Sequence, residues 1–164
     1  VRLALDHVIE HLAPAAVVVG GHSAGGQIAA MLALDQAERG GGPITGLVGI
    51  SGAYDLRPLL RTSINADLCL SEDEAARQSP LVRLGKLPPE APLVPLLAAV
   101  GGEETRGFRA WSAELVEGWR ARGAEAHLME PDGCTHFTIL DAIAVEKPEL
   151  FIRQPSHDML GLNT

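Results

Sequence analysis

The N-terminal part of the chain alternates between helical and strand-like hydrophobic patterns. Apolar side chains recur at helical spacing over residues 5–12, and Pro14 ends that helix because proline cannot continue the hydrogen-bond ladder. Residues 16–19 are an unbroken apolar run, which is typical of a buried strand. Residues 24–38 again follow a helical pattern, and the glycines and proline at residues 40–43 close it with a cap and a loop.

Three further segments of strand length follow. These strands are predicted at residues 44–50, 93–100 and 124–129. Residues 51–91 contain no strand pattern and several prolines, which predicts an excursion over the edge of a sheet. After the turn at Pro131-Asp132-Gly133, a last helix is expected to open at Cys134 and to reach about Lys147.

Two helices in this second part carry recognisable signatures. Ser71 and Glu74 form a capping box that opens a short helix, which ends before Ser79-Pro80. Between the last two strands, an apolar stripe with helical spacing predicts a helix whose aromatic face packs into the core. The members of this stripe are Phe108, Trp111, Leu115 and Trp119.

Strands that alternate with helices predict an α/β fold. We expect a mostly parallel sheet with helices on both faces, because parallel strands need crossover connections that cover the sheet. Residues 1–147 then form one domain, and residues 148–164 are a tail without a pattern.

Composition narrows the class of protein without assigning a function. The chain has 164 residues, is 46% hydrophobic and carries a formal net charge of −8, which suits one soluble domain and argues against nucleic acid or an anionic membrane as partner. No apolar run approaches the roughly 20 residues of a membrane span. Cys69 and Cys134 make no disulfide framework, so a reduced, cytoplasmic setting is expected. A lost leader before Val1 would leave no trace.

The candidate chemistry centres on the junction between the first strand and the helix after it. Gly21-His-Ser23-Ala24-Gly25 is a G-x-S-x-G element in the strand–turn–helix context of a nucleophile elbow. We expect side chains larger than hydrogen at Gly21 and Gly25 to collide with the neighbouring strand and helix. Ser23 is then held on a strained backbone with its hydroxyl exposed, and the amide of Ala24 can stabilise negative charge at the helix N-terminus.

Other interpretations of these glycines fit less well. The spacing supplies no G-x-G-x-x-G dinucleotide fingerprint, and Gln27 and Ile28 stand where a P-loop needs Lys and Ser or Thr. The remaining alternative is a tight strand-to-helix turn in which the serine is incidental.

A serine hydroxyl needs a base to take its proton and a third group to orient that base. His136 follows the fourth predicted strand, in a loop that can swing back over Ser23, and either Glu103 or Glu104 follows the third. Serine, acid, histidine is the chain order of the triad in α/β-hydrolases. Asp132 is a competing acid, but it lies in the same turn as His136, where a solvated aspartate is the simpler interpretation.

The remaining histidines indicate no second site. His22 is expected to pack or hydrogen-bond locally in the elbow, His127 lies within a strand, and His157 lies in the tail. His7-Val-Ile-Glu-His11 spells an inverted zinc motif, H-x-x-E-H. The same letters describe the polar face of an amphipathic helix, and no third ligand stands out downstream, so we expect no metal.

These residues resemble the arylformamidase (kynurenine formamidase) family of serine α/β-hydrolases, which is related to esterases and lipases. The resemblance covers most of residues 16–145, and its second run is more specific than the elbow. The matching positions are Gly21-His-Ser-Ala-Gly-Gly26, Ile50-Ser-Gly-Ala-Tyr-Asp-Leu-Arg-Pro-Leu59, Asn65, Leu68, Leu70, Ser79-Pro80, Val100-Gly-Gly-Glu-Glu104, Phe108 and His136-Phe137.

The resemblance implies a partial α/β-hydrolase fold, with residues 1–147 as the C-terminal portion of one domain. It implies Glu104 as the acid, because the family's acid stands four residues before the phenylalanine that is Phe108 here. The implied reaction is hydrolysis of N-formyl-L-kynurenine to kynurenine and formate, in tryptophan catabolism, with no cofactor. The partner is then a small-molecule substrate, and a homodimer stays open.

If the chain is a hydrolase of this type, we expect the excursion at residues 51–91 to shape the substrate pocket. Within it, Tyr54 is expected either to line the substrate pocket or to serve as ordinary core, since aromatic side chains commonly pack inside.

The chain departs from the family because it contains no His-Gly-Gly loop, which supplies further oxyanion donors there. We therefore expect earlier strands to be missing and the 164 residues alone to be poorly stable and nearly inactive. Losing one such donor costs on the order of a hundredfold in rate. Two alternatives stay open: a carboxylesterase acting on small acyl esters with the same residues, and a non-catalytic module that binds ligands or partners.

Overall fold

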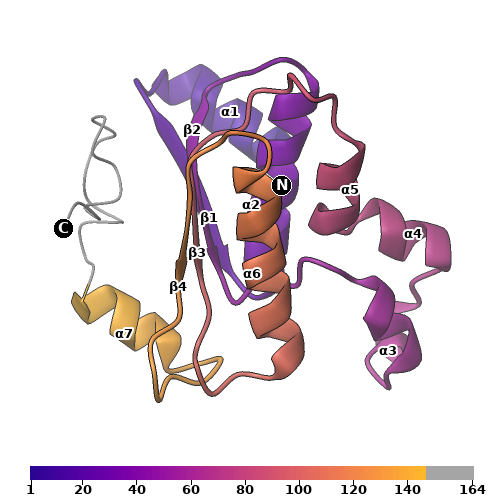
Figure 1. Ribbon diagram of the computed structural model, residues 1–164. Coiled ribbons are helices and arrows are strands. Elements are labelled where there is room, and N and C mark those ends of the chain that lie inside the picture. Colours follow the sequence, from indigo (N-terminus) through magenta and orange to yellow (C-terminus); the bar gives the residue numbers. More distant parts are fainter. Residues whose placement is uncertain (147–164) are drawn as a thin grey trace.

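A computed structural model describes residues 1–146, in which four parallel strands form one sheet (Figure 1). The strands are β1 (Val17–His22), β2 (Ile44–Ile50), β3 (Leu96–Ala99) and β4 (Ala126–Met129), and their order across the sheet follows the sequence. The helices are α1 (Arg2–Leu12), α2 (Ala24–Glu38), η1 (Arg57–Arg61), α3 (Asn65–Leu68), α4 (Glu72–Arg77), α5 (Pro80–Lys86), α6 (Arg106–Arg120) and α7 (Ile139–Glu146). The predicted α/β class and parallel sheet are confirmed.

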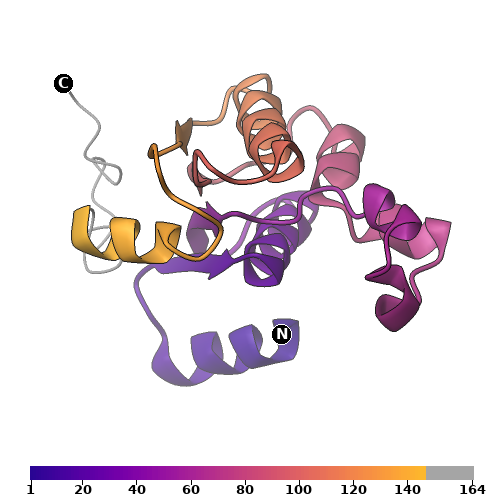
Figure 2. The ribbon, with the colours of Figure 1, turned by 90° about the horizontal axis from the view of Figure 1, so that it is seen from below.

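Helices cover both faces of the sheet, as predicted. Figure 2 shows α2 and α6 on one face and α7 on the other. Alternate residues of each strand point to opposite faces, so Leu47 and Leu96 join the cluster under α2 and α6, while Val48 and Leu97 pack with Ile139 of α7.

The carboxyl ends of the four strands line up at one edge of the sheet. His22 is in register with Ile50, Ile50 with Ala99, and Ala99 with Met129. Whatever follows each of these residues is therefore delivered to the same edge, where open parallel sheets place their ligand sites.

The first strand is longer than the sequence pattern predicted. Gly20 and Gly21, which resemble the start of a turn, continue the parallel pairing with β2 up to His22. The third and fourth strands, predicted at residues 93–100 and 124–129, are shorter, because only residues 96–99 and 126–129 pair with a neighbouring strand.

The last helix begins at Ile139 and not at Cys134, which corrects the predicted start. Residues 134–138 form a turn instead, in which the Thr135 amide donates to the Thr138 hydroxyl oxygen at 2.8 Å. The carbonyl oxygen of Cys134 accepts from the Glu103 amide at 3.0 Å, so a hydrogen bond holds this turn against the loop after β3.

Helix α1 forms and ends before Pro14, but its apolar face stays largely uncovered. None of its residues is buried, and the side chains of Leu3 and Leu12 are 85% and 73% exposed. Leu5 alone is in contact with the main cluster as a partly buried residue of this helix. Figure 2 shows α1 beyond the β1 edge of the sheet.

Residues 51–91 contain no strand, as predicted, and α3 and α4 project away from the sheet in both ribbon views. The capping box of α4 is confirmed, because the Ser71 hydroxyl and the Glu74 carboxylate each bond the other's backbone amide. Within residues 1–146 no helix combines the length and apolarity needed to cross a membrane. The predicted tail at 148–164, with His157, lies outside the described residues.

Candidate functional site

Ser23 occupies a backbone conformation that few residues adopt. Its φ of 56° and ψ of −119° lie in a region that costs energy for any residue with a side chain. The Ser23 amide donates to the carbonyl oxygen of Ile50 at 2.9 Å, which fixes the turn on the end of β2. Its hydroxyl forms no capping bond with α2, so it remains available at the helix N-terminus, where the first amides have no intrahelical partner.

The glycines around Ser23 permit this turn, although not in the way that the sequence predicted. A Cβ at Gly21 would overlap the backbone of Gly25, 2.5 Å from its carbonyl oxygen, which confirms the requirement at Gly21. A Cβ at Gly25 would meet nothing within 4 Å, so the expectation there is wrong. The second tight position is Gly26, where a Cβ would lie 3.0 Å from the Gly21 carbonyl oxygen. The helix backbone itself fills the space beside Gly21.

Glu104 lies after β3 with its side chain 1% exposed and surrounded by donors. One carboxylate oxygen, Oε1, accepts from the Ser51 hydroxyl at 2.5 Å and from the Gly101 amide at 2.8 Å. The other, Oε2, lies 2.7 Å from Nδ1 of His136. Both carboxylate oxygens of Glu104 are therefore occupied by hydrogen-bond partners. Glu103, the alternative acid, is exposed.

His136 lies in the loop between β4 and α7 with its side chain 24% exposed. In the neutral tautomer in which Nδ1 donates to Glu104, the lone pair that a general base needs lies on Nε2. The ring packs against those of Phe108 and His22, with centroid separations of 4.8 and 4.5 Å. Asp132, the other candidate acid, is exposed in the preceding turn.

The structure thus brings Glu104 and His136 into direct contact and places the elbow beside them. His22, which immediately precedes Ser23, donates from Nε2 to the carbonyl oxygen of His136 at 2.7 Å. Within residues 1–146 no hydrogen bond joins the Ser23 hydroxyl to the His136 ring. The His136 loop therefore rests on the end of the elbow strand.

The sequence does not predict two of these contacts. It favours a local partner for His22, but the hydrogen-bond partner stands 114 residues away. The motif around Ser51 does not indicate its bond to Glu104, although Ser51 directly follows β2, as Ser23 follows β1, and this position at a strand end is a usable signal.

Tyr54 lies in the hydrophobic core with no exposed surface. A Cβ at Gly49 or Gly52 would strike its ring or hydroxyl, so these two glycines make the space for it. Burial raises the pKa of Tyr54 well above its usual range, and its hydroxyl has no hydrogen-bond partner in the described part of the chain. The structure therefore places Tyr54 in the packing and not on a pocket wall.

No group of three or more potential ligands that could hold a metal occurs among residues 1–146. The rings of His7 and His11 do share one face of α1, with centroids 3.8 Å apart. Nδ1 of His11 already contacts the carbonyl oxygen of His7 at 2.8 Å. His127 lies in β4, with Nε2 at 3.2 Å from a Glu125 oxygen.

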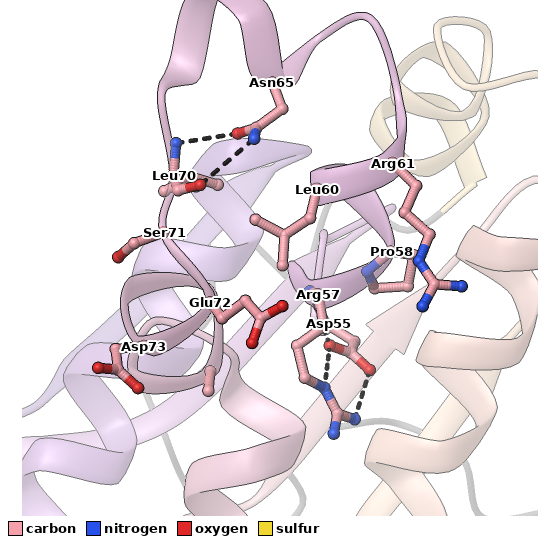
Figure 3. A pocket seen from close by; sticks show the side chains of 11 residues that line it. Asp55, Arg57, Pro58, Leu60, Arg61, Asn65, Leu70, Ser71, Glu72 and Asp73 are labelled. Atoms are coloured by element: carbon pink, nitrogen blue, oxygen red, sulfur yellow. Dashed lines mark hydrogen bonds and ion pairs between the residues drawn. The ribbon is translucent and has the colours of Figure 1, made fainter.

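The excursion holds a cavity of about 1040 Å³ lined by charged, polar and apolar side chains (Figure 3). Asp55 pairs with Arg57 through both carboxylate oxygens, at 2.9 and 2.7 Å. The Asn65 side chain closes the neighbouring turn by bonding both the amide and the carbonyl of Leu70. The residues around the cavity are Asp55, Arg57, Pro58, Leu60, Arg61, Asn65, Leu70, Ser71, Glu72, Asp73 and Ala76.

Comparison with known proteins agrees with this fold. Residues 2–140 match the family described as the α/β hydrolase fold. The kynurenine formamidase of Danio rerio is 32% identical over 77% of this chain and 44% of its own length, and that of Salmo salar is 31% identical over 75% and 43%. A Silicibacter protein provisionally described as a thioesterase has a crystal structure that matches with a TM-score of 0.65 and 26% identity, over 87% of this chain and 52% of its own. The resemblance to arylformamidases is confirmed, and the chain spans less than half the length of those two relatives.

Proposed function

The chain belongs to the α/β-hydrolase fold family, and from that premise we propose that it acts as a serine hydrolase of the arylformamidase type. The observation that carries the proposal is the buried Glu104 carboxylate bonded to His136, whose loop is in turn bonded to the residue before Ser23. A non-catalytic binding module would have no need of this constellation.

In the proposed reaction Ser23 is the nucleophile and His136 the general base. The Ser23 oxygen attacks the formyl carbon of N-formyl-L-kynurenine while Nε2 of His136 takes the hydroxyl proton. When the tetrahedral intermediate collapses, the carbon–nitrogen bond breaks and the departing arylamine takes that proton, leaving a formyl ester on Ser23. Water then attacks the ester, His136 takes its proton, and formate leaves as the proton returns to Ser23.

Glu104 and Ala24 have supporting roles in this mechanism. The Glu104 carboxylate holds His136 in the tautomer with the proton on Nδ1 and stabilises the imidazolium that forms. The amide of Ala24, the first residue of α2, points its partial positive charge at the oxyanion.

We also propose that the excursion at residues 51–91 contributes to substrate binding. Its cavity carries charges of both signs, from Arg61 on one side and Glu72 on the other, which suits a zwitterionic amino acid (Figure 3).

The test is a substrate panel with the full-length protein. We expect a higher kcat/KM for N-formyl-L-kynurenine than for p-nitrophenyl acetate and other small esters. The second candidate, a carboxylesterase, has support from the likeness to the provisional thioesterase, and it predicts the reverse order. Lack of turnover of every compound in the panel would contradict both.

A further inference from the structure

The loop that carries His136 is fastened firmly on its acid side. The amides of Gly102 and Glu103 donate to the carbonyl oxygens of Pro131 and Cys134, each at 3.0 Å. The bond between Nδ1 of His136 and Oε2 of Glu104 adds a side-chain link of 2.7 Å. All three bonds come from the segment that follows β3, and none of them fixes the distance between the imidazole and the elbow.

On the elbow side, a single side chain reaches the same loop. Among the described residues, the only hydrogen bond from the β1–α2 junction to the His136 loop is donated by Nε2 of His22 to the carbonyl oxygen of His136, at 2.7 Å. The two imidazole rings also lie 4.5 Å apart, tilted by 47°. Strand alternation turns His22 to the α7 face together with Val18 and Gly20, where all three line one small cavity.

We propose that His22 is a positioning residue for the proposed reaction, because it holds the backbone of His136 against the strand end from which Ser23 projects. The inference rests on the proposed function, in which His136 must stand over Ser23. A carbonyl oxygen can only accept, so Nε2 of His22 carries a proton in this contact and is not a base for the serine. His22 thereby fixes the distance between the His136 imidazole and the elbow, which the hydrogen bonds from Glu104 and its neighbours do not fix.

Two substitutions separate the hydrogen bond from the packing of the ring. His22→Phe keeps an aromatic ring and loses the donor, whereas His22→Gln places an amide N–H near the position of Nε2. His127→Phe is the matched control, because His127 lies in the same sheet and its ring nitrogen contacts only a Glu125 side chain among the described residues. Hydrogen exchange of residues 130–138 and the separate values of kcat and KM are measured for each protein.

We expect His22→Phe to speed exchange across residues 130–138 by about tenfold, as loss of one hydrogen bond implies, and to lower kcat by about 10- to 100-fold with little change in KM. His22→Gln should restore both values, and His127→Phe should alter neither. If His22→Phe does not fold, His22→Asn, which is polar but too short to reach, replaces it.

Unchanged exchange, or unchanged kcat, in the variant that lacks the donor would overturn the inference. Exchange reads the tether without any chemistry. Faster exchange in a protein whose wild type hydrolyses nothing would therefore reject the proposed function while the tether stands.

Discussion

The nucleophile side and the acid side of the proposed site are held by different kinds of interaction. Ser23 is positioned by its backbone, through a positive φ of 56° and a glycine at Gly21 that leaves no room for a Cβ. Glu104 is positioned by side-chain and loop hydrogen bonds, from Ser51, Gly101 and His136.

This difference determines how each side responds to change. A backbone turn closes or fails to close, so substitutions that affect it should act on folding and activity together. A carboxylate with several donors can lose one and keep its place, so substitutions there should act on activity in steps. The predictions below test that contrast, from the largest expected effect on turnover to the smallest.

Glu104→Gln should lower turnover by about 10⁴-fold, because an amide no longer holds His136 in the working tautomer. The matched control is Glu103→Gln, which alters an exposed neighbour and should leave turnover unchanged. Steady-state kinetics on the best substrate of the panel measures both. A greater loss in the control would transfer the acid role to Glu103.

Gly21→Ala should lower turnover by about 100-fold, since a Cβ there displaces Gly25 and with it the elbow. The same change should reduce the free energy of unfolding by about 1–3 kcal/mol, as overpacking usually does. Gly25→Ala is the control, because its Cβ points into open space. Kinetics and urea unfolding compare the pair, and equal losses in the two variants would refute a steric requirement at Gly21.

Ser51→Ala should lower turnover by about tenfold, which corresponds to the loss of one hydrogen bond to a charged group. Glu104 keeps the Gly101 amide and the His136 ring, so the loss should stop well short of that in Glu104→Gln. Ser63→Ala, at an exposed serine of the excursion, controls for the substitution itself. Wild-type kinetics in Ser51→Ala would show that the acid needs no such donor.

Asp55→Asn should lower stability and hardly change kcat, because the bonds of this carboxylate in the described residues run to Arg57 and Ser79 and not to the imidazole. Asp55 lines the cavity proposed to bind substrate, so any effect on turnover should appear in KM. The bonded Arg57 guanidinium holds the pKa of Asp55 below its ordinary value. The stabilisation, about 1–3 kcal/mol, is therefore complete above the unfolded pKa of about 4 and is lost as pH falls through the lower folded value. Urea unfolding of both proteins between about pH 6 and pH 3 should show the difference narrowing. A difference independent of pH would mean that the charge of Asp55 is not its source.

The sequence pattern predicted those parts of the fold that depend on local chemistry. The strand at 44–50 and the capping box at Ser71 came out at the expected residues. The hydrophobic pattern of α1 predicted which face of the helix is apolar but not what covers that face. In the structure most of this apolar face is exposed. The start of α7 was misplaced because the turn before it is held by the loop after β3, which is distant in sequence.

In the site, too, local features were predictable and distant contacts were not. The sequence predicted Ser23, Glu104 and His136 as one site, because each follows a strand and parallel strands end at one edge of the sheet. The hydrogen bond from His22 to His136 could not be predicted, since nothing in the residues near position 22 indicates a partner 114 residues away. Likewise, the open space at Gly25 depends on the path of the helix backbone and not on the motif.

The most direct test of the central claim is to treat the full-length protein with a fluorophosphonate and map the adduct by mass spectrometry. A strained, activated serine predicts one adduct on Ser23, no adduct in Ser23→Ala, and slow labelling in Glu104→Gln. A folded protein that forms no adduct, or carries it on another residue, would contradict the account.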